Sequence, residues 1–354
     1  MRYVRNAWYV AGWSGDLAVA TPLAVTILNE RLVLYRTAAG KVVALEDRCV
    51  HRLAPLSLGQ CEGDAIRCMY HGLLFGPDGK CREIPGQEII PVHAAVKSYA
   101  AVDRHSWLWI WMGDPAKADE ALIPAAVGLD DPRWILGHGQ LDYAAEARLI
   151  NDNLLDFTHL SYVHPNSFGA SEEWARGRPE VIPLERGVRF QRWLPDQIGM
   201  AVGGQSNRID IWSSYDFMVP GILLMQSANF EPGTAQSRGR RPPDAELMAK
   251  ADGATFTSQA VTPITEHTAR YFFSWGPRSD WGNEGVRDEL MAVAANAFAE
   301  DKRMIEAQQQ VIIGTAVPRV MPTSADRGVL LFNRLVDRLL KAEGGAQAAP
   351  MAAE

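Results

Sequence analysis

The sequence predicts an α+β fold with two domains, an all-β domain followed by a mixed domain. The chain has 354 residues and is 47% hydrophobic, which is enough to bury two cores. Apolar and β-branched runs separated by turn residues fill residues 1–115, without helical periodicity. From residue 141 to 340 strand patterns and helical patterns both occur. We expect residues 116–140 to link the domains and residues 341–354 to form a disordered tail.

Individual elements follow from these patterns. In the first domain, the runs RLVLYR, KVVALED and SWLWIWMGD predict strands, because they are apolar and bounded by turn residues. In the second domain, residues 150–164 have an apolar content typical of a buried helix. Residues 209–230 and 255–276 predict strands, and residues 284–312 predict one long amphipathic helix.

Composition limits the partners of the chain. The formal net charge of −7 argues against nucleic acid, since phosphate binding usually leaves a basic stripe. No run approaches the ~20 apolar residues of a membrane span, and the N-terminus lacks the pattern of a signal peptide. We therefore expect a cytoplasmic protein that binds neither nucleic acid nor membranes. In that compartment, cysteines more often bind metal or lie buried as thiols than form disulfides.

A first candidate metal site has the spacing C-x-H, sixteen residues, C-x-x-H. It comprises Cys49, His51, Cys68 and His71, so that each short segment offers one thiolate and one imidazole. Zinc fingers usually pair like ligands in each segment, whereas a [2Fe–2S] cluster with two histidines needs a mixed pair. The pattern favours the cluster, with structural zinc as the alternative. Cys61 and Cys81 fit no ligand spacing and are expected to be structural.

A second constellation lies in the segment NDNLLDFTHLSYVHP. On an ideal helix Asn153, Asp156 and His159 share one face. His164 would point away from that face, but Pro165 disfavours helical geometry at the residue before it. We expect the helix to loosen there, so that the two imidazoles converge beside a buried carboxylate.

The predicted long helix supplies a third ligand. Its apolar stripe contains Ala294, Ala297, Phe298, Met304 and Ile305. Asp301 falls within this stripe, where a carboxylate is costly unless it binds a cation or finds several donors. Two histidines and one carboxylate form a typical Fe(II) site with open positions for O₂. Glu300 lies outside the stripe, and we expect it to be solvated.

Together these motifs resemble those of a known family. CVHRLAPLSLG with CMYHGLLF resembles the Rieske motif, although Val50 and Met69 stand where relatives commonly have proline. The spacing N-x-x-D-x-x-H-x₄-H with a distant aspartate resembles the catalytic domain of Rieske non-haem iron oxygenases. The match extends from NAWYV near the N-terminus to the glutamine-rich end of the long helix. Within this family, the chain is similar in particular to vanillate O-demethylase oxygenases and related methyl-aryl monooxygenases.

The resemblance implies an all-β Rieske domain, a helix-grip-like α+β catalytic domain, and two iron centres. Its ligand assignments are Cys49, His51, Cys68 and His71 for one [2Fe–2S] cluster, and His159, His164 and Asp301 for one mononuclear Fe(II). Asn153 would be a neighbouring or weak axial group. Asp156 would link His71 of a neighbouring subunit to His159, which implies a homotrimeric ring.

The resemblance also implies the reaction and its partners. The chain would be a terminal oxygenase that uses O₂ on a small aromatic substrate, with electrons from an NAD(P)H-dependent reductase. That reductase would carry flavin and a ferredoxin-type cluster, with or without a separate ferredoxin. The leading hypothesis is O-demethylation of a methoxylated aromatic acid with release of formaldehyde. The alternatives are ring hydroxylation, N-demethylation, methyl-group hydroxylation, and a non-catalytic electron-transfer or zinc-binding module.

The substrate pocket is the part of the site that the motifs define least. Residues of the second domain's strands are its apolar candidates, namely Phe217, Met218, Leu223, Met225, Phe272 and Trp275. For the acid group of a substrate, Arg270 and Gln259 are the candidate partners.

Overall fold

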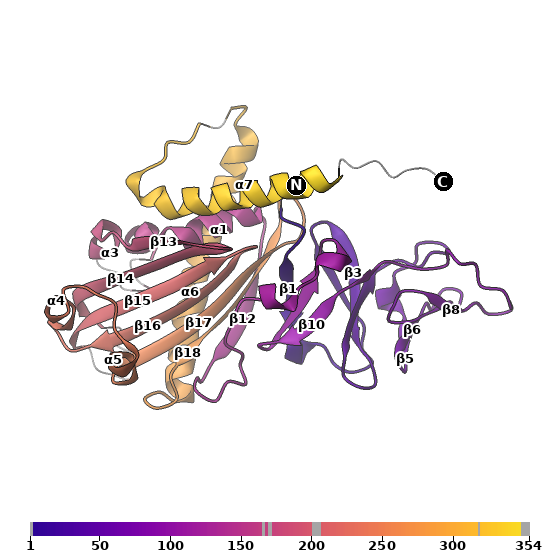
Figure 1. The fold of residues 1–354 in the computed structure, drawn as a ribbon, viewed down its shortest axis with the longest axis horizontal. Coiled ribbons are helices and arrows are strands. Elements are labelled where there is room, and N and C mark those ends of the chain that lie inside the picture. The colour runs from indigo at the N-terminus through magenta and orange to yellow at the C-terminus, as the bar shows by residue number, and fades with distance from the viewer. Residues whose placement is uncertain (1–2, 165–166, 169–171, 200–206, 318, 348–354) are drawn as a thin grey trace. The chain divides into compact units, whose positions relative to one another are not determined.

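The chain forms two compact units in a computed structural model (Figure 1). The first contains residues 1–128 and 262–266, and the second contains residues 129–261 and 267–354. The structure describes residues 3–164, 167–168, 172–199, 207–317 and 319–347. The first unit is built on β-strands and the second is mixed, which confirms the predicted fold class. The exact boundaries predicted from the sequence stay a prediction.

The first unit contains three small antiparallel sheets. Their strand orders are β1 (Trp8–Trp13), β11 (Trp107–Trp111) and β10 (Ala101–Arg104); β2 (Leu23–Ile27), β3 (Glu30–Arg36), β4 (Val42–Glu46) and β9 (Ser98–Tyr99); and β5 (Gln60–Glu62), β6 (Ala65–Arg67), β7 (Leu74–Phe75) and β8 (Cys81–Glu83). Every residue of β1 and β11 is buried, as expected of strands without polar alternation. Short 3₁₀ helices occur at Ser14–Asp16, Leu56–Leu58, Pro115–Lys117 and Glu120–Leu122.

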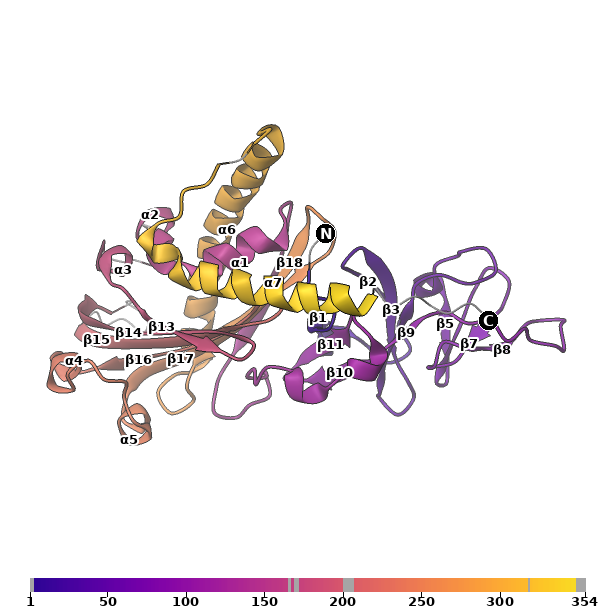
Figure 2. The ribbon, with the colours of Figure 1, turned by 45° about the horizontal axis from the view of Figure 1, so that its top comes forward.

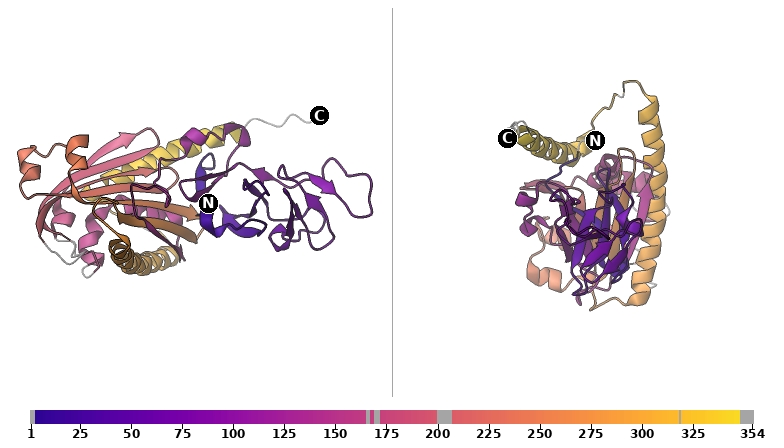
Figure 3. Two further views of the ribbon diagram at one scale, coloured as in Figure 1. Left: turned by 90° about the horizontal axis from the view of Figure 1, so that it is seen from below. Right: turned by 90° about the vertical axis from the view of Figure 1, so that its right-hand side faces the viewer.

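The second unit is organised around a seven-stranded sheet. Its order is β12 (Gly137–Tyr143), β18 (Ala269–Pro277), β17 (Asp252–Pro263), β16 (Ile222–Phe230), β15 (Arg208–Met218), β14 (Gly187–Ile198) and β13 (Glu180–Leu184). The helices are α1 (Ala147–Leu155), η5 (Phe157–His159), α2 (Leu160–Val163), α3 (Glu172–Arg176), α4 (Thr234–Ser237), α5 (Ala245–Ala249), α6 (Glu284–Gly314), η7 (Ser324–Asp326) and α7 (Arg327–Gln347). Figure 3 shows α6 as one uninterrupted helix.

Helices α6 and α7 cover the same face of this sheet (Figure 2). On α6, Phe298 packs against Tyr271, with ring centroids 5.1 Å apart. On α7, Phe332 packs against Phe217 at 4.9 Å. Phe217 pairs with Leu223 of β16, and Leu223 pairs with Gln259 of β17, so these side chains lie on one face of the sheet. The Tyr271 hydroxyl donates to Gln259 on the same face. Aromatic side chains therefore anchor both helices above a single apolar surface.

The opposite face has its own smaller core. Trp193 and Trp212 lie 5.3 Å apart and pack with Phe230 and with residues from the segment that contains α4 and α5. This layer covers the face of the sheet opposite to α6 and α7.

The predicted strands at 209–230 and 255–276 and the predicted long helix are confirmed. The sequence patterns did not predict β12, β13, β14 or α7. Residues 341–347, expected in a disordered tail, continue α7, because Lys341–Glu343 are good helix formers. Residues 348–354 lie outside the described residues. None of the described helices is both long and apolar enough to cross a membrane.

Candidate metal centres

Two loops of the first unit carry the C-x-H and C-x-x-H segments, and they have the same backbone pattern. In the first, the Leu53 N–H donates to the Cys49 carbonyl at 2.9 Å, and in the second, the Gly72 N–H donates to the Cys68 carbonyl at 2.9 Å. Each cysteine N–H also donates to the carbonyl five residues later, at 2.8 Å in both loops. Leu53 and Gly72 both have positive φ, 59° and 80°. These turns fold each loop back over its cysteine.

The second loop depends on glycine. A Cβ at Gly72 would lie 2.7 Å from the Cγ atom of Pro85, and the φ of 80° is unfavourable for other residues. Glycine is therefore required there both by the backbone conformation and by the close approach of Pro85. The residue lies next to His71, so its conformation also sets the direction of that ligand.

Burial separates the thiols of this site from its imidazoles. Cys49 and Cys68 are each 1% exposed, whereas His51 and His71 are exposed, with ring centroids 4.4 Å apart. The pKa of the Cys49 thiol is raised to about 11, mainly by burial and also by the neighbouring Cys68, although a backbone hydrogen bond at His51 partly opposes this. A bound metal cation reverses this preference, because thiolates bind metals in the deprotonated state. The loops thus fit a cluster with a buried cysteine-bound side and an exposed histidine-bound side.

The second unit brings His159, His164 and Asp301 together. Their ligand atoms all lie within 4.8 Å of one another. The Oδ1 atom of Asp301 is 3.5 Å from Nε2 of His159 and 3.1 Å from Nε2 of His164. Asp301 comes from α6, and the histidines come from η5 and from the residue that follows α2. Two imidazoles and one carboxylate that converge on one point form the donor set typical of a mononuclear Fe(II) site.

Hydrogen bonds at the outer nitrogens fix both imidazoles for metal binding. Nδ1 of His159 donates to the Asp156 carbonyl at 2.5 Å, and Nδ1 of His164 donates to Oε2 of Glu300 at 2.8 Å. Each Nε2 therefore presents a lone pair to the centre. Nε2 of His164 is buried without a hydrogen-bond partner among the described residues, and His164 is 0% exposed. A metal ion bound at this point would take the lone pair of this buried nitrogen.

The electrostatic surroundings favour positive charge at the site. Burial lowers the pKa of His159, which keeps the imidazole neutral. Burial also lowers the pKa of His164, but the carboxylates of Asp301 and Glu300 outweigh it, and the pKa is raised overall. These carboxylates attract positive charge to the site, whether a proton or a metal ion. Asn153 lies beside these ligands, and its Nδ2 donates to Oδ1 of Asp301 at 3.1 Å.

The helix predicted through Asp156 ends earlier than expected. Helix α1 stops at Leu155, and Asp156 adopts an extended conformation with φ −132°. The Asp156 carboxylate accepts a hydrogen bond from the Thr158 N–H at 2.8 Å and so caps the next short helix. Aspartate is a favoured capping residue, which explains the break. The convergence of the histidines therefore begins at Asp156, and His164 loosens the chain a second time.

The expectation that Glu300 is solvated is wrong. Its side chain is 32% exposed and accepts hydrogen bonds from His164 and from the Ser167 hydroxyl, the latter at 2.7 Å. Burial raises the pKa of the Glu300 carboxyl, but these hydrogen bonds outweigh it and lower the pKa overall. The sequence signal was available, because a metal-binding histidine needs an acceptor for its other ring nitrogen.

A cavity of about 910 Å³ opens onto the mononuclear site. Asn153, His159 and Asp301 lie in its wall together with side chains from the covered face of the sheet and from α6. Of the six apolar candidates, Met225 and Trp275 line the cavity. Phe217, Leu223 and Phe272 are instead at most 1% exposed within the core, and Met218 packs beside Gly187 at the edge of the sheet.

The two candidate partners for a substrate acid group differ. Gln259 lines the cavity, as expected. Arg270 does not, because its guanidinium group pairs with the Asp142 carboxylate at 2.6 Å and 2.7 Å. Among the described lining residues Arg208 is the cationic one, and it pairs with Asp196 at 2.6 Å. Neutral donors are therefore the groups available to an acidic substrate.

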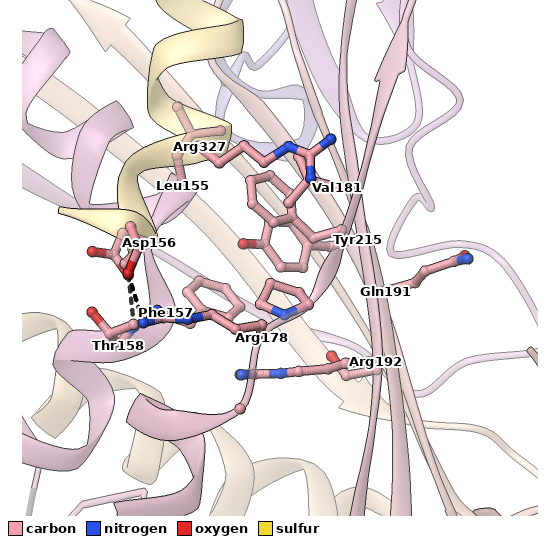
Figure 4. Close-up of a pocket in the computed structure, with 16 residues that line it drawn as sticks. Leu155, Asp156, Phe157, Thr158, Arg178, Val181, Gln191, Arg192, Tyr215 and Arg327 are labelled. Carbon is pink, nitrogen blue, oxygen red and sulfur yellow. Dashed lines mark hydrogen bonds between the residues drawn. The ribbon is translucent and has the colours of Figure 1, made fainter. Parts of the chain in front are cut away.

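A smaller pocket of about 310 Å³ lies beside the capping residue Asp156 (Figure 4). Asp156 contributes to its wall, as do the guanidinium groups of Arg178, Arg192 and Arg327. Nη2 of Arg192 is buried without a hydrogen-bond partner among the described residues, and burial lowers the pKa of Arg192 to about 10. The pocket thus holds three arginines and one aspartate in its wall, and the backbone carbonyl of that aspartate accepts the hydrogen bond from His159.

Comparison with known protein families agrees with this geometry. The Rieske [2Fe-2S] domain family matches residues 7–100, and the vanillate O-demethylase oxygenase C-terminal domain family matches residues 143–342. The chain belongs to the vanillate O-demethylase oxygenase family of Rieske oxygenases. It therefore carries a Rieske [2Fe–2S] cluster and a mononuclear non-haem iron, and it is the oxygenase component of a system with several components.

Individual relatives cover the whole chain. An iron-sulfur subunit of a toluene-4-sulfonate monooxygenase system from Comamonas testosteroni is 39% identical over 98% of this chain and 99% of its own. A vanillate O-demethylase oxygenase subunit from a Pseudomonas strain is 32% identical over 99% of both chains. A crystal structure of dicamba monooxygenase bound to 3,6-dichlorosalicylic acid has a TM-score of 0.86, with 29% identity over 97% of this chain and 99% of that chain.

Proposed function

We propose that this oxygenase hydroxylates a methyl carbon of a small aromatic acid, and that its leading reaction is oxidative O-demethylation with release of formaldehyde. The observation that carries the proposal is the cavity of about 910 Å³, which opens directly onto His159 and Asp301. Its volume lies within the range of small-molecule sites and leaves room for a substituted aromatic ring. The relatives named for vanillate and dicamba O-demethylation support a methoxy group as the reacting substituent.

Within the cavity, this chain's residues would hold the ring and its acid group. Phe168, Met225 and Trp275 supply apolar contact on the side of the mononuclear site. The indole N–H of Trp275 is buried without a partner among the described residues, so it is free to donate to an oxygen of the substrate. The amide of Asn229 lies in the same wall. These donors would orient the ring so that the methyl carbon faces the iron, where O₂ is activated when the metal is bound.

A second reaction on the same site is oxidation of the methyl group of an arenesulfonate. The observation that favours it is the 39% identity to the toluene-4-sulfonate monooxygenase subunit, which exceeds the 32% identity to the vanillate enzyme. Both reactions act on a methyl carbon of a ring that also carries an acidic group. N-demethylation is the weaker alternative, since the methylxanthine N1-demethylase among the relatives is 27% identical over 86% of this chain.

Electrons would come from a separate NAD(P)H-dependent reductase with flavin and a ferredoxin-type cluster. Within a homotrimer, His71 of one chain would approach Asp156 of the next chain and pass an electron to His159. Two contacts support this path. The Asp156 carboxylate lines the arginine-rich pocket, and its backbone carbonyl holds Nδ1 of His159. Electrons that arrive at this pocket are therefore one hydrogen bond from an iron ligand.

The proposal is tested by supplying the purified oxygenase with a reductase and two substrate sets. Methoxybenzoates are expected to give formaldehyde and the corresponding phenols, whereas a methylated arenesulfonate would give the benzylic alcohol. A preference of at least about tenfold in kcat/KM, equivalent to 1.4 kcal/mol, decides between them. A cis-diol formed from an unsubstituted arene would overturn the proposal.

Recognition of the acid group is tested separately with Trp275→Phe. This change keeps the aromatic surface and removes the indole donor, so KM for the acid is expected to rise about tenfold, as expected for one lost hydrogen bond. Trp281→Phe is the matched control, because its indole N–H already donates to the Ala254 carbonyl at 2.8 Å. An unchanged KM in Trp275→Phe would remove this residue from substrate binding.

A further inference from the structure

His164 lies between two consecutive carboxylates of one helix. Asp301 faces its Nε2 atom at 3.1 Å, and Glu300 accepts the hydrogen bond from its Nδ1 atom at 2.8 Å. The ring is completely buried, so no solvent competes for either nitrogen. Adjacent residues on a helix point about 100° apart, which allows α6 to reach both sides of one imidazole.

The two histidines of the centre are held by different kinds of acceptor. Nδ1 of His159 meets a neutral backbone carbonyl, from Asp156, which no side-chain substitution at that position removes. Nδ1 of His164 meets a charged carboxylate, which can be removed. A carboxylate acceptor makes the opposite nitrogen a stronger ligand and fixes its tautomer. The site therefore has one fixed ligand and one whose strength depends on the side chain at position 300.

Glu300 is itself held in place. Its Oε2 atom accepts a second hydrogen bond, from the Ser167 hydroxyl at 2.7 Å. The two donors act on the same oxygen, so they fix the orientation of the carboxylate. Ser167 follows His164 closely along the chain, and both side chains donate to Glu300.

We propose that Glu300 is a positioning residue that sets the affinity of the mononuclear site for Fe(II) by fixing His164 with Nε2 directed at the metal. The residue does not touch the metal or the substrate. It acts by holding the ligand in the binding tautomer and orientation before the metal arrives. The inference rests on the iron centre and not on the substrate, so its failure would leave the proposed reaction unaffected.

The test measures Fe(II) affinity of the full-length protein by anaerobic competition with a ferrous chelator, and circular dichroism with thermal unfolding reports whether the second unit is folded. Glu300→Ala is expected to weaken the affinity about 10- to 100-fold, the usual range for a residue that holds a metal ligand. Glu300→Gln keeps an oxygen acceptor and is expected to lie between Ala and wild type. Ser167→Ala removes only one donor and is expected to cost about fivefold or less.

Glu284→Gln is the matched control, because it removes one carboxylate from the same helix at a position that is 80% exposed. Its affinity is expected to equal that of wild type. The inference is overturned if Glu300→Ala holds Fe(II) as tightly as wild type, or if Glu284→Gln weakens it to the same degree. If Glu300→Ala does not fold, Glu300→Gln and Ser167→Ala decide, and wild-type affinity in both would likewise overturn it.

Discussion

The two metal centres of this chain are built in opposite ways. The cluster site lies in two short loops that repeat the same pair of backbone hydrogen bonds, and its histidines are exposed. The mononuclear site takes ligands from two separate regions of the chain, and its second histidine is completely buried. Local backbone geometry therefore defines the first site, whereas tertiary packing of α6 against the sheet defines the second.

This difference predicts that the centres can be removed one at a time. Cys68→Ser is expected to abolish the cluster, because a serine hydroxyl replaces a thiolate that bridges a buried loop to iron. The expected result is loss of the cluster's visible spectrum and of all turnover with the reductase. Cys61→Ser is the control, since Cys61 forms no disulfide and lies outside both ligand segments in the sequence, and it should keep the spectrum. A full cluster spectrum in Cys68→Ser would contradict the assignment.

Asp301→Ala is expected to remove the mononuclear iron and to leave the cluster in place. It removes the carboxylate on which both histidines converge, so the mononuclear iron is lost while the cluster spectrum stays intact. Turnover is expected to fall at least about 10³-fold, because metal-assisted steps supply several kcal/mol. Iron analysis beside the spectrum checks this. Asp288→Asn, which is 69% exposed on the same helix, should retain activity.

The local origin of the cluster loops makes them sensitive to backbone changes. Gly72→Ala places a Cβ 2.7 Å from Pro85 at a φ of 80°, which is expected to destabilise the first unit by about 1–3 kcal/mol. Thermal unfolding followed by cluster absorbance measures the effect. Gly63→Ala is a useful comparison, because it shares a positive φ but has open space around its Cβ. Equal losses in the two variants would show that conformation alone, and not the Pro85 contact, is responsible.

In the second unit, the buried carboxyl group of Asp152 is expected to make the stability of the fold depend on pH, with a smaller effect than those above. Burial raises the pKa of Asp152 to about 6, although Arg148 and Asn333 partly oppose this. The folded state thus holds this proton more tightly than the unfolded chain. The protonated Asp152 carboxyl therefore contributes most to the free energy of unfolding below about pH 4. This contribution is lost as pH rises through about 6.

Asp152→Asn removes this ionisation. The variant is expected to be more stable than wild type by ~1–2 kcal/mol at pH 7, and the two should converge near pH 4. The figure allows for the 31% exposure of the side chain. Denaturant unfolding at both pH values measures the difference. A constant difference across this range would contradict the raised pKa.

The same contrast explains what could be predicted from the sequence. The cluster loops were readable because four ligands in a fixed spacing define them. His159, His164 and Asp301 were also readable, because charged residues in apolar segments need partners. The break at Asp156 could not be predicted, because the sequence pattern is helical on both sides of it, whereas the Asp156 side chain caps a new short helix. Glu300 was missed because its partner lies outside its own helix, and α7 and β14 carried no motif that drew attention to them.

The most direct test of the account is the iron and zinc content of the anaerobically purified chain, together with its visible and EPR spectra before and after dithionite. Two irons in a histidine-bound cluster and one at the mononuclear site predict about three irons per chain and a reducible cluster signal. Treatment with a ferrous chelator should then remove one iron and leave the cluster spectrum. Zinc in place of iron, without a cluster spectrum, would contradict the account.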